Sequence, residues 1–477
     1  MARLSRPRLT RVTFLSRPSI QLSAIRLPGP SREREPAAVC APDQPTLEWT
    51  DWVQRRDKFL EQLTIDFDRD ESLCPRLPDW LTLFSLPEQL LLAYERHRET
   101  SELGHVFRIA NSLHDHLDAI TVIGPASSNL AAEAVTSACC DPFHNEMSRA
   151  ERGSKPRLYF ADFEPDNDSI QSLAWRLQRH GYGDVHAERR WGMILIDAPN
   201  TRDQWLPLFR YFSTQLDHWT DHLADRPFPL TIITPRPNDW NEAMTGGIAF
   251  QTLLQNDELT GHRGILSPST LLPAAFLGLD VIQLLVGAAV INQNFQKASA
   301  ADNLVFRWNQ ACEQRACWLV NESPSFDRLL HWWSQLEWPI ANGGVQSMRS
   351  CDAGEKLQRG RDPFTSHSNS SPRHVALHLA PGVERTDPIV LKTPVRSESR
   401  STAEPLDRSQ KVSDLRSQQR EELRERLATV GAEQYQLSLP GIDTHALGQW
   451  IQLALLSSAI IAANKHDFKS DDSVPVG

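Results

Sequence analysis

The sequence predicts an α/β protein built from two doubly wound domains, each a parallel β-sheet covered by helices. The chain has 477 residues, enough for two or three domains with a full hydrophobic core. Short apolar runs alternate with stretches of helical periodicity, and this order of elements is typical of a parallel sheet with helices on both faces. The alternation occurs in residues 103–245 and again in residues 301–465, so two domains are expected.

The segment before the first domain, residues 46–102, has acidic and apolar positions at helical spacing, with Pro78 and Pro87 as expected breaks. The first domain then contains four apolar runs that are expected to be strands. They are Ile120–Ile123, Arg157–Phe160, Met193–Ile196 and Leu230–Ile233, with helical stretches between them such as Asn129–Ala138 and Ile170–Arg179.

Residues 246–300 are predicted to be a mostly helical connection to the second domain. The second domain has expected strands at Ala316–Val320, His374–His378 and Gln434–Ser438, and expected helices at Phe326–Leu336 and Leu415–Thr429. Residues 381–410 are rich in proline, serine and arginine, which favours a long surface loop. Residues 466–477 are expected to be a C-terminal tail.

Residues 1–45 carry arginine, serine and proline but no acidic residue before Glu33. A disordered tail is expected there, and a targeting segment or a start site assigned too early remain alternatives. No secretory apolar segment is present. The longest apolar stretch, residues 447–463, is interrupted by Gln449 and Gln452 and is too short to span a bilayer. We therefore expect no membrane association and a cytoplasmic location.

The net charge of −10 argues against nucleic-acid binding, because no basic stripe interleaved with aromatic residues accompanies it. Seven cysteines are an odd number, which argues against a complete internal disulfide framework. His114 and His116 flank Asp115, but a zinc site needs further ligands at suitable spacing, so a solvent-exposed face is the simpler interpretation. No metal or other cofactor is expected.

Three blocks of sequence resemble the glucose-6-phosphate isomerase family, in the family's order. Gly261–Asp280 contains a polar Gly/Arg loop, a serine, L-L-P-A-A and G-L-D, similar to G-G-R-x-S-x-L-S-x-V-G-L-L-P-A-A-x-x-G-I-D. Phe143–Phe160 resembles the bacterial members, and Leu437–Trp450 resembles the family's closing strand, acidic turn and helix. The chain therefore looks like a divergent member of this family.

The resemblance implies a tandem pair of sugar-isomerase (SIS) domains with the ligand cleft between them. It implies the interconversion of glucose 6-phosphate and fructose 6-phosphate in glycolysis and gluconeogenesis, without metal or nucleotide. It also implies a homodimer in which each cleft takes residues from the partner chain.

The turn after the first expected strand, Gly124–Ser128, matches the family's G-I-G-G-S-x-L-G only in part. Ser128 and Leu130 match, whereas Ala126 and Ser127 replace glycines that would let the backbone approach a ligand closely. Ser128 is a candidate phosphate contact, and capping of the following helix is the alternative.

The turn Asp197–Thr201 takes the place of the family's S-K-S-G-G-T phosphate loop, and Thr201 is its surviving candidate phosphate contact. Asp197 replaces a hydroxyl donor with an anion. At ~4 Å from a phosphate charge such an anion costs on the order of 4 kcal/mol at an effective dielectric near 20. This substitution argues against ordinary sugar-phosphate binding.

Arg263 matches the arginine of G-G-R-x-S if one residue is deleted after it, and His262 takes that place without a gap. By resemblance this arginine stabilises the enediol-like intermediate, a role suited to a fixed guanidinium. A plain surface arginine is the alternative for Arg263.

The family's proton-transfer base is a glutamate. Gapless alignment puts Pro339 at its position, and a two-residue shift brings in Glu337 as the candidate base. A positioned base supplies roughly 10²–10⁴-fold in rate, so the difference matters. A solvated carboxylate at a helix end is the alternative role for Glu337.

The segment expected to hold the family's ring-opening histidine, Met348–Asp362, contains no histidine. Lys356 falls at the expected place and is the candidate proton donor, although lysine accepts protons poorly unless burial lowers its pKa. For the family's C-terminal lysine, Lys465 and Lys469 are weak substitutes.

Two functions follow from these comparisons of motifs. An intact isomerase is one, and a non-catalytic relative that serves as a sugar-phosphate sensor or a partner subunit is the other. The altered phosphate turns and base segment favour the second. A different SIS reaction, such as amino-sugar isomerisation, is a third alternative.

Overall fold

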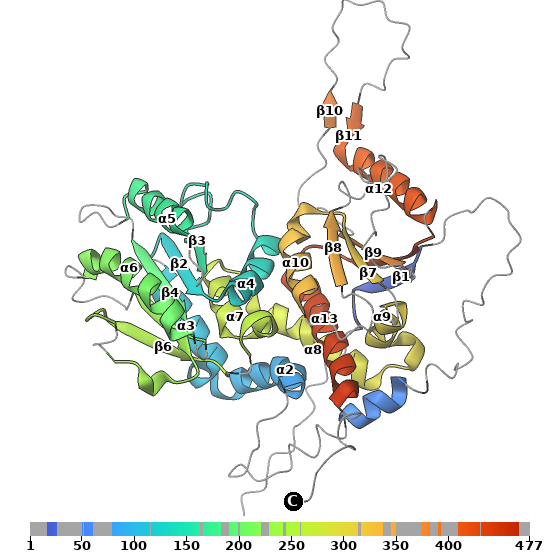
Figure 1. Cartoon of the computed structure of the whole chain (residues 1–477), viewed down its shortest axis with the longest axis horizontal. Helices are drawn as coiled ribbons and strands as arrows, with labels where there is room; N and C mark the ends of the chain where they lie inside the picture. Colours follow the sequence, from blue (N-terminus) through green and yellow to red (C-terminus); the bar gives the residue numbers. More distant parts are fainter. Residues whose placement is uncertain are drawn as a thin grey trace, which may run out of the picture.

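The computed structural model shows two β-sheets with a layer of helices between them (Figure 1). The described residues are 17–25, 50, 52–60, 79–114, 116–162, 166–182, 190–198, 201–220, 229–241, 245–257, 259–312, 316–336, 345–349, 374–381, 390–392, 409–429 and 431–466. In Figure 1 the first sheet lies on the left and the second on the right, with helices α7 (Pro268–Phe276), α8 (Val281–Lys297) and α13 (Thr444–His466) between them.

The first sheet is parallel throughout and has the strand order β3-β2-β4-β5-β6. Its strands are β2 (Ala119–Gly124), β3 (Arg157–Asp162), β4 (Trp191–Ile196), β5 (Leu230–Thr234) and β6 (Phe250–Leu254). Every residue of β2 and β4 is buried, because these central strands are covered on both faces.

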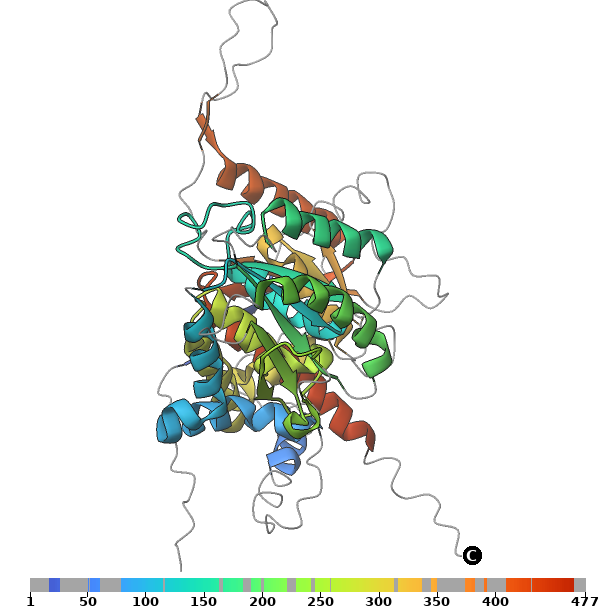
Figure 2. The ribbon, with the colours of Figure 1, turned by 90° about the vertical axis from the view of Figure 1, so that its left-hand side faces the viewer.

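Alternate side chains of this sheet pack against different helices. Ile120 and Ile194 join the core that contains α4 (Ala126–Cys139), whereas Ile123 and Met193 join the core that contains α5 (Asn167–Arg179) and α6 (Arg202–Thr220). Figure 2 faces this side of the molecule and shows α5 and α6 in front of the strands. The period of two follows from the pleat of a strand, which points successive side chains to opposite faces.

The second sheet has the order β1-β12-β9-β7-β8. Its parallel strands are β7 (Ala316–Asn321), β8 (Val345–Arg349), β9 (His374–Pro381) and β12 (Glu433–Leu439), and β1 (Gln21–Ala24) adds an antiparallel edge. Helices α9 (Leu304–Cys312), α10 (Asp327–Gln335) and α12 (Val412–Thr429) belong to this half. The predicted fold class, an α/β protein with two doubly wound, mainly parallel sheets, is confirmed.

The structure also contains several further elements. They are helices α2 (Asp79–His97) and α3 (Glu102–His114), a helical stretch at 52–60, the short strands β10 (Val390–Lys392) and β11 (Ser409–Lys411), and the 3-10 helices η2 (Arg98–Thr100), η3 (Pro237–Asp239), η4 (Gly261–Leu266), η5 (Ala300–Asp302) and η6 (Pro324–Phe326). No helix in the described part of the chain combines the length and apolar character that a membrane span requires.

Helices α8 and α13 touch backbone to backbone through a pair of glycines. A Cβ atom added to Gly448 would lie 1.9 Å from the carbonyl oxygen of Leu284, and one added to Gly287 would lie 2.0 Å from that of His445. Because glycine lacks a Cβ, the two helices can approach this closely.

Three fully buried tryptophans tie α10 to its neighbours. Trp333 of α10 stacks on Trp308 of α9 with ring centroids 4.6 Å apart, and its centroid lies 5.4 Å from that of Trp450 on α13. Aromatic pairs at these distances add about 0.5–1.5 kcal/mol each beyond the area they bury. The tryptophan face of α10 is thereby fixed, and its other face lies toward the first sheet.

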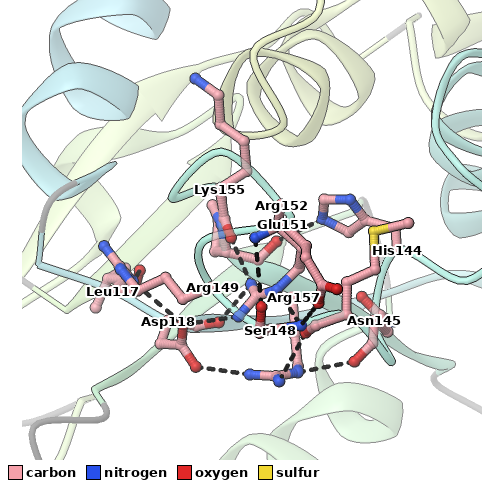
Figure 3. Close-up of polar contacts among 12 residues, drawn as sticks. Leu117, Asp118, His144, Asn145, Ser148, Arg149, Glu151, Arg152, Lys155 and Arg157 are labelled. Atoms are coloured by element: carbon pink, nitrogen blue, oxygen red, sulfur yellow. Dashed lines mark hydrogen bonds and ion pairs between the residues drawn. The ribbon is translucent and has the colours of Figure 1, made fainter.

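The start of β2 is held by a cluster of arginines around Asp118, shown in Figure 3. The Asp118 carboxylate lies 2.8 Å from Arg152, 2.7 Å from Arg157 and 3.2 Å from Arg149, and accepts a hydrogen bond from Tyr182. Arg152 and Arg157 also donate to the backbone oxygen of Met147, within the block Phe143–Phe160. This block therefore anchors the amino end of β2, away from the carboxyl end of the strand.

The structure differs from the sequence predictions at four places outside the site. Pro87 does not break the helix: α2 runs through it, because Leu83, Leu86 and Leu90 on its apolar face are buried. Residues 250–254, within the predicted helical connection, form β6, and residues 21–24, within the predicted tail, form β1. The predicted surface loop 381–410 includes β10 and begins with the last residue of β9.

Candidate functional site

The strand order of the first sheet marks the place where a ligand is expected. β2 pairs with β3 on one side and β4 on the other, so the chain crosses in opposite directions from this strand. In open parallel sheets such a switch point leaves a crevice beyond the carboxyl ends of the strands, where ligands bind. Here α4 begins at Ala126, two residues after β2 ends.

A cavity of about 610 Å³ lies at this switch point, between the two halves of the molecule. The first turns of α4, the end of β3 and the first turn of α6 line it from the first half, and α10 lines it from the second. η4, from the connection between them, contributes His262. A volume of this size fits a small-molecule ligand.

The amino terminus of α4 contributes backbone groups, and no charged side chain, to the cavity wall. Pro125 is the N-cap residue, with φ −58° and ψ 141°, and Ala126 and Ser127 follow it along the cavity wall. The unpaired N–H groups at a helix amino terminus and the helix dipole favour a negatively charged group nearby.

One wall of the cavity is acidic. Asp162, at the end of β3, accepts a 2.7 Å hydrogen bond from the side-chain amide of Asn129, which is only 1 % exposed. Glu133 lies one turn further along α4. Burial raises the pKa of the Glu133 carboxyl, Arg328 opposes that rise, and the negative charge of Asp162 adds to it. The two carboxylates are thus close enough to influence each other.

The other wall carries basic groups. Arg328 and His331 lie three residues apart on α10, and Arg328 Nε is 3.2 Å from Glu133 Oε2 across the cavity. Burial lowers the pKa of His262, and the neighbouring His331 lowers it further. Trp332 Nε1 donates to the His262 backbone oxygen at 2.8 Å, which fixes η4 against α10.

The two hydroxyls predicted as phosphate contacts are engaged within the protein. Ser128 is fully buried in the first turn of α4, and its Oγ accepts a 3.0 Å hydrogen bond from the Gly261 N–H. Thr201 Oγ1 donates to the Ala198 carbonyl oxygen at 2.7 Å, immediately before α6. The cavity is lined by their neighbours, Ser127 and Gln204.

Asp197 has a different environment from the one expected. Its Oδ2 accepts hydrogen bonds from Thr234 Oγ1 at 2.8 Å and from Trp240 Nε1 at 3.3 Å. This carboxylate is therefore directed to the β5 side of the turn, and Asp197 does not line the cavity. The predicted repulsion of a phosphate by Asp197 loses its geometric basis.

Of the predicted catalytic residues, one falls within the described part of the chain. Arg263 is half-buried in η4, beside the cavity-lining His262, and does not itself line the cavity. Glu337 and Lys356 lie outside the described residues, as does Lys469. Gln335, two residues before Glu337, lines the cavity.

Sequence reasoning missed four cavity residues, Glu133, Asp162, Arg328 and His331. They come from α4, β3 and α10, and no short motif contains them. His262 did have a signal, because the alignment without a gap places it at the family's arginine. No group of three or more His, Cys, Asp or Glu side chains suited to a metal ion occurs among the described residues.

The carboxyl end of β7, the switch point of the second sheet, is filled by protein groups. The buried Glu322 carboxylate lies 3.0 Å from His378, 3.3 Å from Arg424 and 3.4 Å from Arg420. Burial opposes ionisation of Glu322, but the hydrogen bond from His378 and the charges around it lower its pKa overall. This cluster is paired internally, so the cavity at β2 is the better candidate site.

Comparison with solved structures identifies the fold. A hypothetical protein from Thermus thermophilus superposes with a TM-score of 0.60 at 19 % identity, over 87 % of this chain and 91 % of that one. A glucose-6-phosphate isomerase from Chlamydia trachomatis gives a TM-score of 0.56 at 12 % identity, over 86 % and 80 %. The chain therefore has the fold of the SIS-type sugar isomerases.

Sequence comparison finds similarity to glucose-6-phosphate isomerases. The chain is 23 % identical over 249 residues to glucose-6-phosphate isomerase of Listeria monocytogenes, and 24 % identical over 267 residues to that of Bacillus cytotoxicus. These matches cover 50 % and 54 % of this chain, and 52 % and 54 % of the relatives. The chain spans about half the length of the curated relatives it matches. No protein-family model matches it.

Proposed function

We propose that this protein binds a hexose phosphate in the cavity between its two halves and interconverts the aldose and ketose forms, as glucose-6-phosphate isomerase does. The observation that carries the proposal is the cavity at the β2 switch point, where imidazole, guanidinium and carboxylate side chains lie together. Sequence similarity to glucose-6-phosphate isomerases supports the choice of substrate.

The reaction requires removal of a proton from the carbon next to the carbonyl and its return to the neighbouring carbon, through an enediolate. We propose Glu337 as the carbon base, because Gln335, two residues before it, lines the cavity. His262 is proposed to move the hydroxyl proton, since its lowered pKa keeps the imidazole neutral near pH 7. Arg263 and Lys356 remain proposals as the enediolate-stabilising cation and the ring-opening proton donor.

A non-catalytic sugar-phosphate sensor is the second candidate. Two observations favour it: Ala126 and Ser127 stand at the cavity where the family has glycines, and the hydroxyls of Ser128 and Thr201 are bonded within the protein. The two candidates share the ligand and differ in turnover.

The test is an isomerase assay on purified protein with fructose 6-phosphate, in which glucose 6-phosphate formation is coupled to NADPH production. Turnover that is lost in Glu337→Gln supports the isomerase, and turnover that survives this change removes the assignment of the base. Arg176→Gln, which alters an exposed α5 arginine paired with Glu146, is the control.

Binding is measured separately by thermal shift with glucose 6-phosphate, because a ligand that binds only the folded state raises the unfolding temperature. A shift without turnover supports the sensor. Absence of both a shift and turnover contradicts the proposal in either form. We also propose that the protein is a homodimer and that it is located in the cytoplasm. A measurement of its mass in solution tests the homodimer.

A further inference from the structure

The phosphate position implied by family resemblance is already occupied by internal contacts. Ser128 Oγ accepts the Gly261 N–H and is fully buried, and Thr201 Oγ1 donates to Ala198. Ser128 is fully buried and does not line the cavity, and Thr201 Oγ1 must give up its hydrogen bond to Ala198 before it can donate to a phosphate oxygen. A net protein hydrogen bond is worth about 0.5–1.5 kcal/mol, so this exchange would subtract from the affinity for phosphate.

Arg328 is a cation on the cavity wall. Its side chain is 57 % exposed, and among the described residues its ion-pair partner is Glu133, reached through Nε. A guanidinium carries five N–H donors and binds carboxylate or phosphate through two of them at once. One contact to Glu133 therefore leaves donors for a ligand.

His331 follows Arg328 by one helical turn, and both side chains line the cavity. Residues three apart on a helix lie on the same face, which is why the two project to the same region. His262 is close enough to His331 for their charges to influence each other. The α10 wall thus gathers cationic and imidazole groups.

The opposite wall differs in kind. Asp162 is held in place by the buried amide of Asn129 and lies near Glu133. Two carboxylates accept hydrogen bonds from hydroxyl groups but repel a phosphate. The side chains of the cavity are therefore polarised, with carboxylate acceptors from Glu133 of α4 and Asp162 of β3 facing the guanidinium and imidazole donors of α10.

We propose that Arg328 and His331 on α10 bind the anionic group of the ligand, while Asp162 and Glu133 bind its hydroxyl groups. This inference rests on the proposed binding of a sugar phosphate in the cavity. It places the phosphate on the second half of the molecule, away from the turns that follow β2 and β4. An incoming phosphate competes with Glu133 for Arg328, so the ion pair that joins α4 to α10 responds to the ligand.

The experiment measures dissociation constants by calorimetry for glucose 6-phosphate, inorganic phosphate and glucose. Arg328→Gln removes the charge and keeps much of the length, and is expected to weaken both phosphate ligands about tenfold or more. Arg328→Lys keeps the charge and is expected to lose less. Glu133→Gln removes the competing carboxylate and is expected to strengthen binding of inorganic phosphate about threefold.

Three further variants locate the anion independently. Arg176→Gln, a surface arginine in an exposed ion pair, controls for loss of one positive charge and should bind like the wild type. Ser128→Ala and Thr201→Ala should change affinity for phosphate less than about twofold, because Ser128 is buried outside the cavity lining and the Thr201 hydroxyl already donates to Ala198. If Thr201→Ala weakens binding of both phosphate ligands and Arg328→Gln does not, the anion lies at the strand-end turns and the inference is wrong.

The two proposals fail in different ways. If the wild-type protein binds neither phosphate ligand, the proposed function fails and this inference fails with it. If the wild type binds glucose 6-phosphate and Arg328→Gln binds it with unchanged affinity, the proposed function stands and only the inference fails.

Discussion

The backbone N–H of Gly261 donates a 3.0 Å hydrogen bond to Oγ of Ser128, 133 residues earlier in the chain. This bond joins the first turn of α4 to η4, and both elements line the cavity. Ser128→Ala leaves the partly buried Gly261 N–H without its acceptor, which costs about 0.5–1.5 kcal/mol in the free energy of unfolding. Urea unfolding measures this loss, and sugar-phosphate affinity should stay within about twofold. Unchanged stability with weakened binding would show that Ser128 contacts the ligand after all.

Glu88 provides a test that depends on pH. Asn292 on α8 donates to both carboxyl oxygens of Glu88 on α2, at 2.9 and 2.8 Å, and burial raises the pKa of Glu88 from 4.5 to about 8. The folded protein therefore keeps a proton that the unfolded chain loses near pH 4.5. The stability that this proton contributes is complete below pH 4.5 and is lost as the pH rises through about 8.

Glu88→Gln is expected to flatten this dependence, so that above about pH 8 the variant exceeds the wild type by ~2–4 kcal/mol. Unfolding curves from about pH 5 to 9 measure the difference. Glu102, whose pKa burial raises to about 7, titrates in the same range, so Glu102→Gln is the matched comparison. If the stability of the wild type and of Glu88→Gln changes with pH in the same way, the raised pKa of Glu88 is contradicted.

Substitution of Asp118 is expected to lower the stability of the protein without changing the residues that line the cavity. Burial alone would raise the pKa of Asp118, but hydrogen bonds from Tyr182 and the arginines outweigh it and lower that pKa below 3.8. Its contribution is present above pH 3.8 and is lost as the pH falls through the folded value. Asp118→Asn leaves the buried Arg152 without its anion, which costs about 3–5 kcal/mol in thermal or urea unfolding. A change below about 1 kcal/mol would be incompatible with the cluster as the anchor of β2.

His262 makes the activity depend on pH, if the protein turns over. The imidazole must be neutral to accept a proton, so kcat/KM should fall on the acid side as His262 is protonated. His331 lowers the pKa of His262, and His331→Ala should therefore move this acid limb to higher pH. His262→Gln should reduce kcat by about 10²-fold or more. If the acid limb of the pH profile does not move in His331→Ala, then His331 does not influence the pKa of His262.

The central strands could be located from the sequence for a simple physical reason. β2, β4 and β5 are buried along their whole length, so they appear as continuous apolar runs. β6 is only partly buried, and its sequence Phe250–Leu254 mixes polar and apolar residues, so it did not stand out from the helical stretch that follows.

The site was harder to predict because its side chains meet only after folding. Glu133, Asp162 and Arg328 belong to α4, β3 and α10. These elements are far apart in the sequence, because β4, β5 and β6 of the first sheet all lie between β3 and α10. The direction of a single side chain was also beyond the sequence. Asp197 follows a strand at the expected edge, yet hydrogen bonds from Thr234 and Trp240 turn its carboxylate toward β5.

β1, formed by residues near the start of the chain, protects an edge of the second sheet. It covers the outer edge of β12, while Ser19 beside it accepts and donates hydrogen bonds with Gln449, 430 residues away. Proteolytic removal of residues 1–25 would bare the N–H and C=O groups along β12. Such an open edge recruits strands from other molecules, so the shortened protein should aggregate even though its ligand pocket is intact.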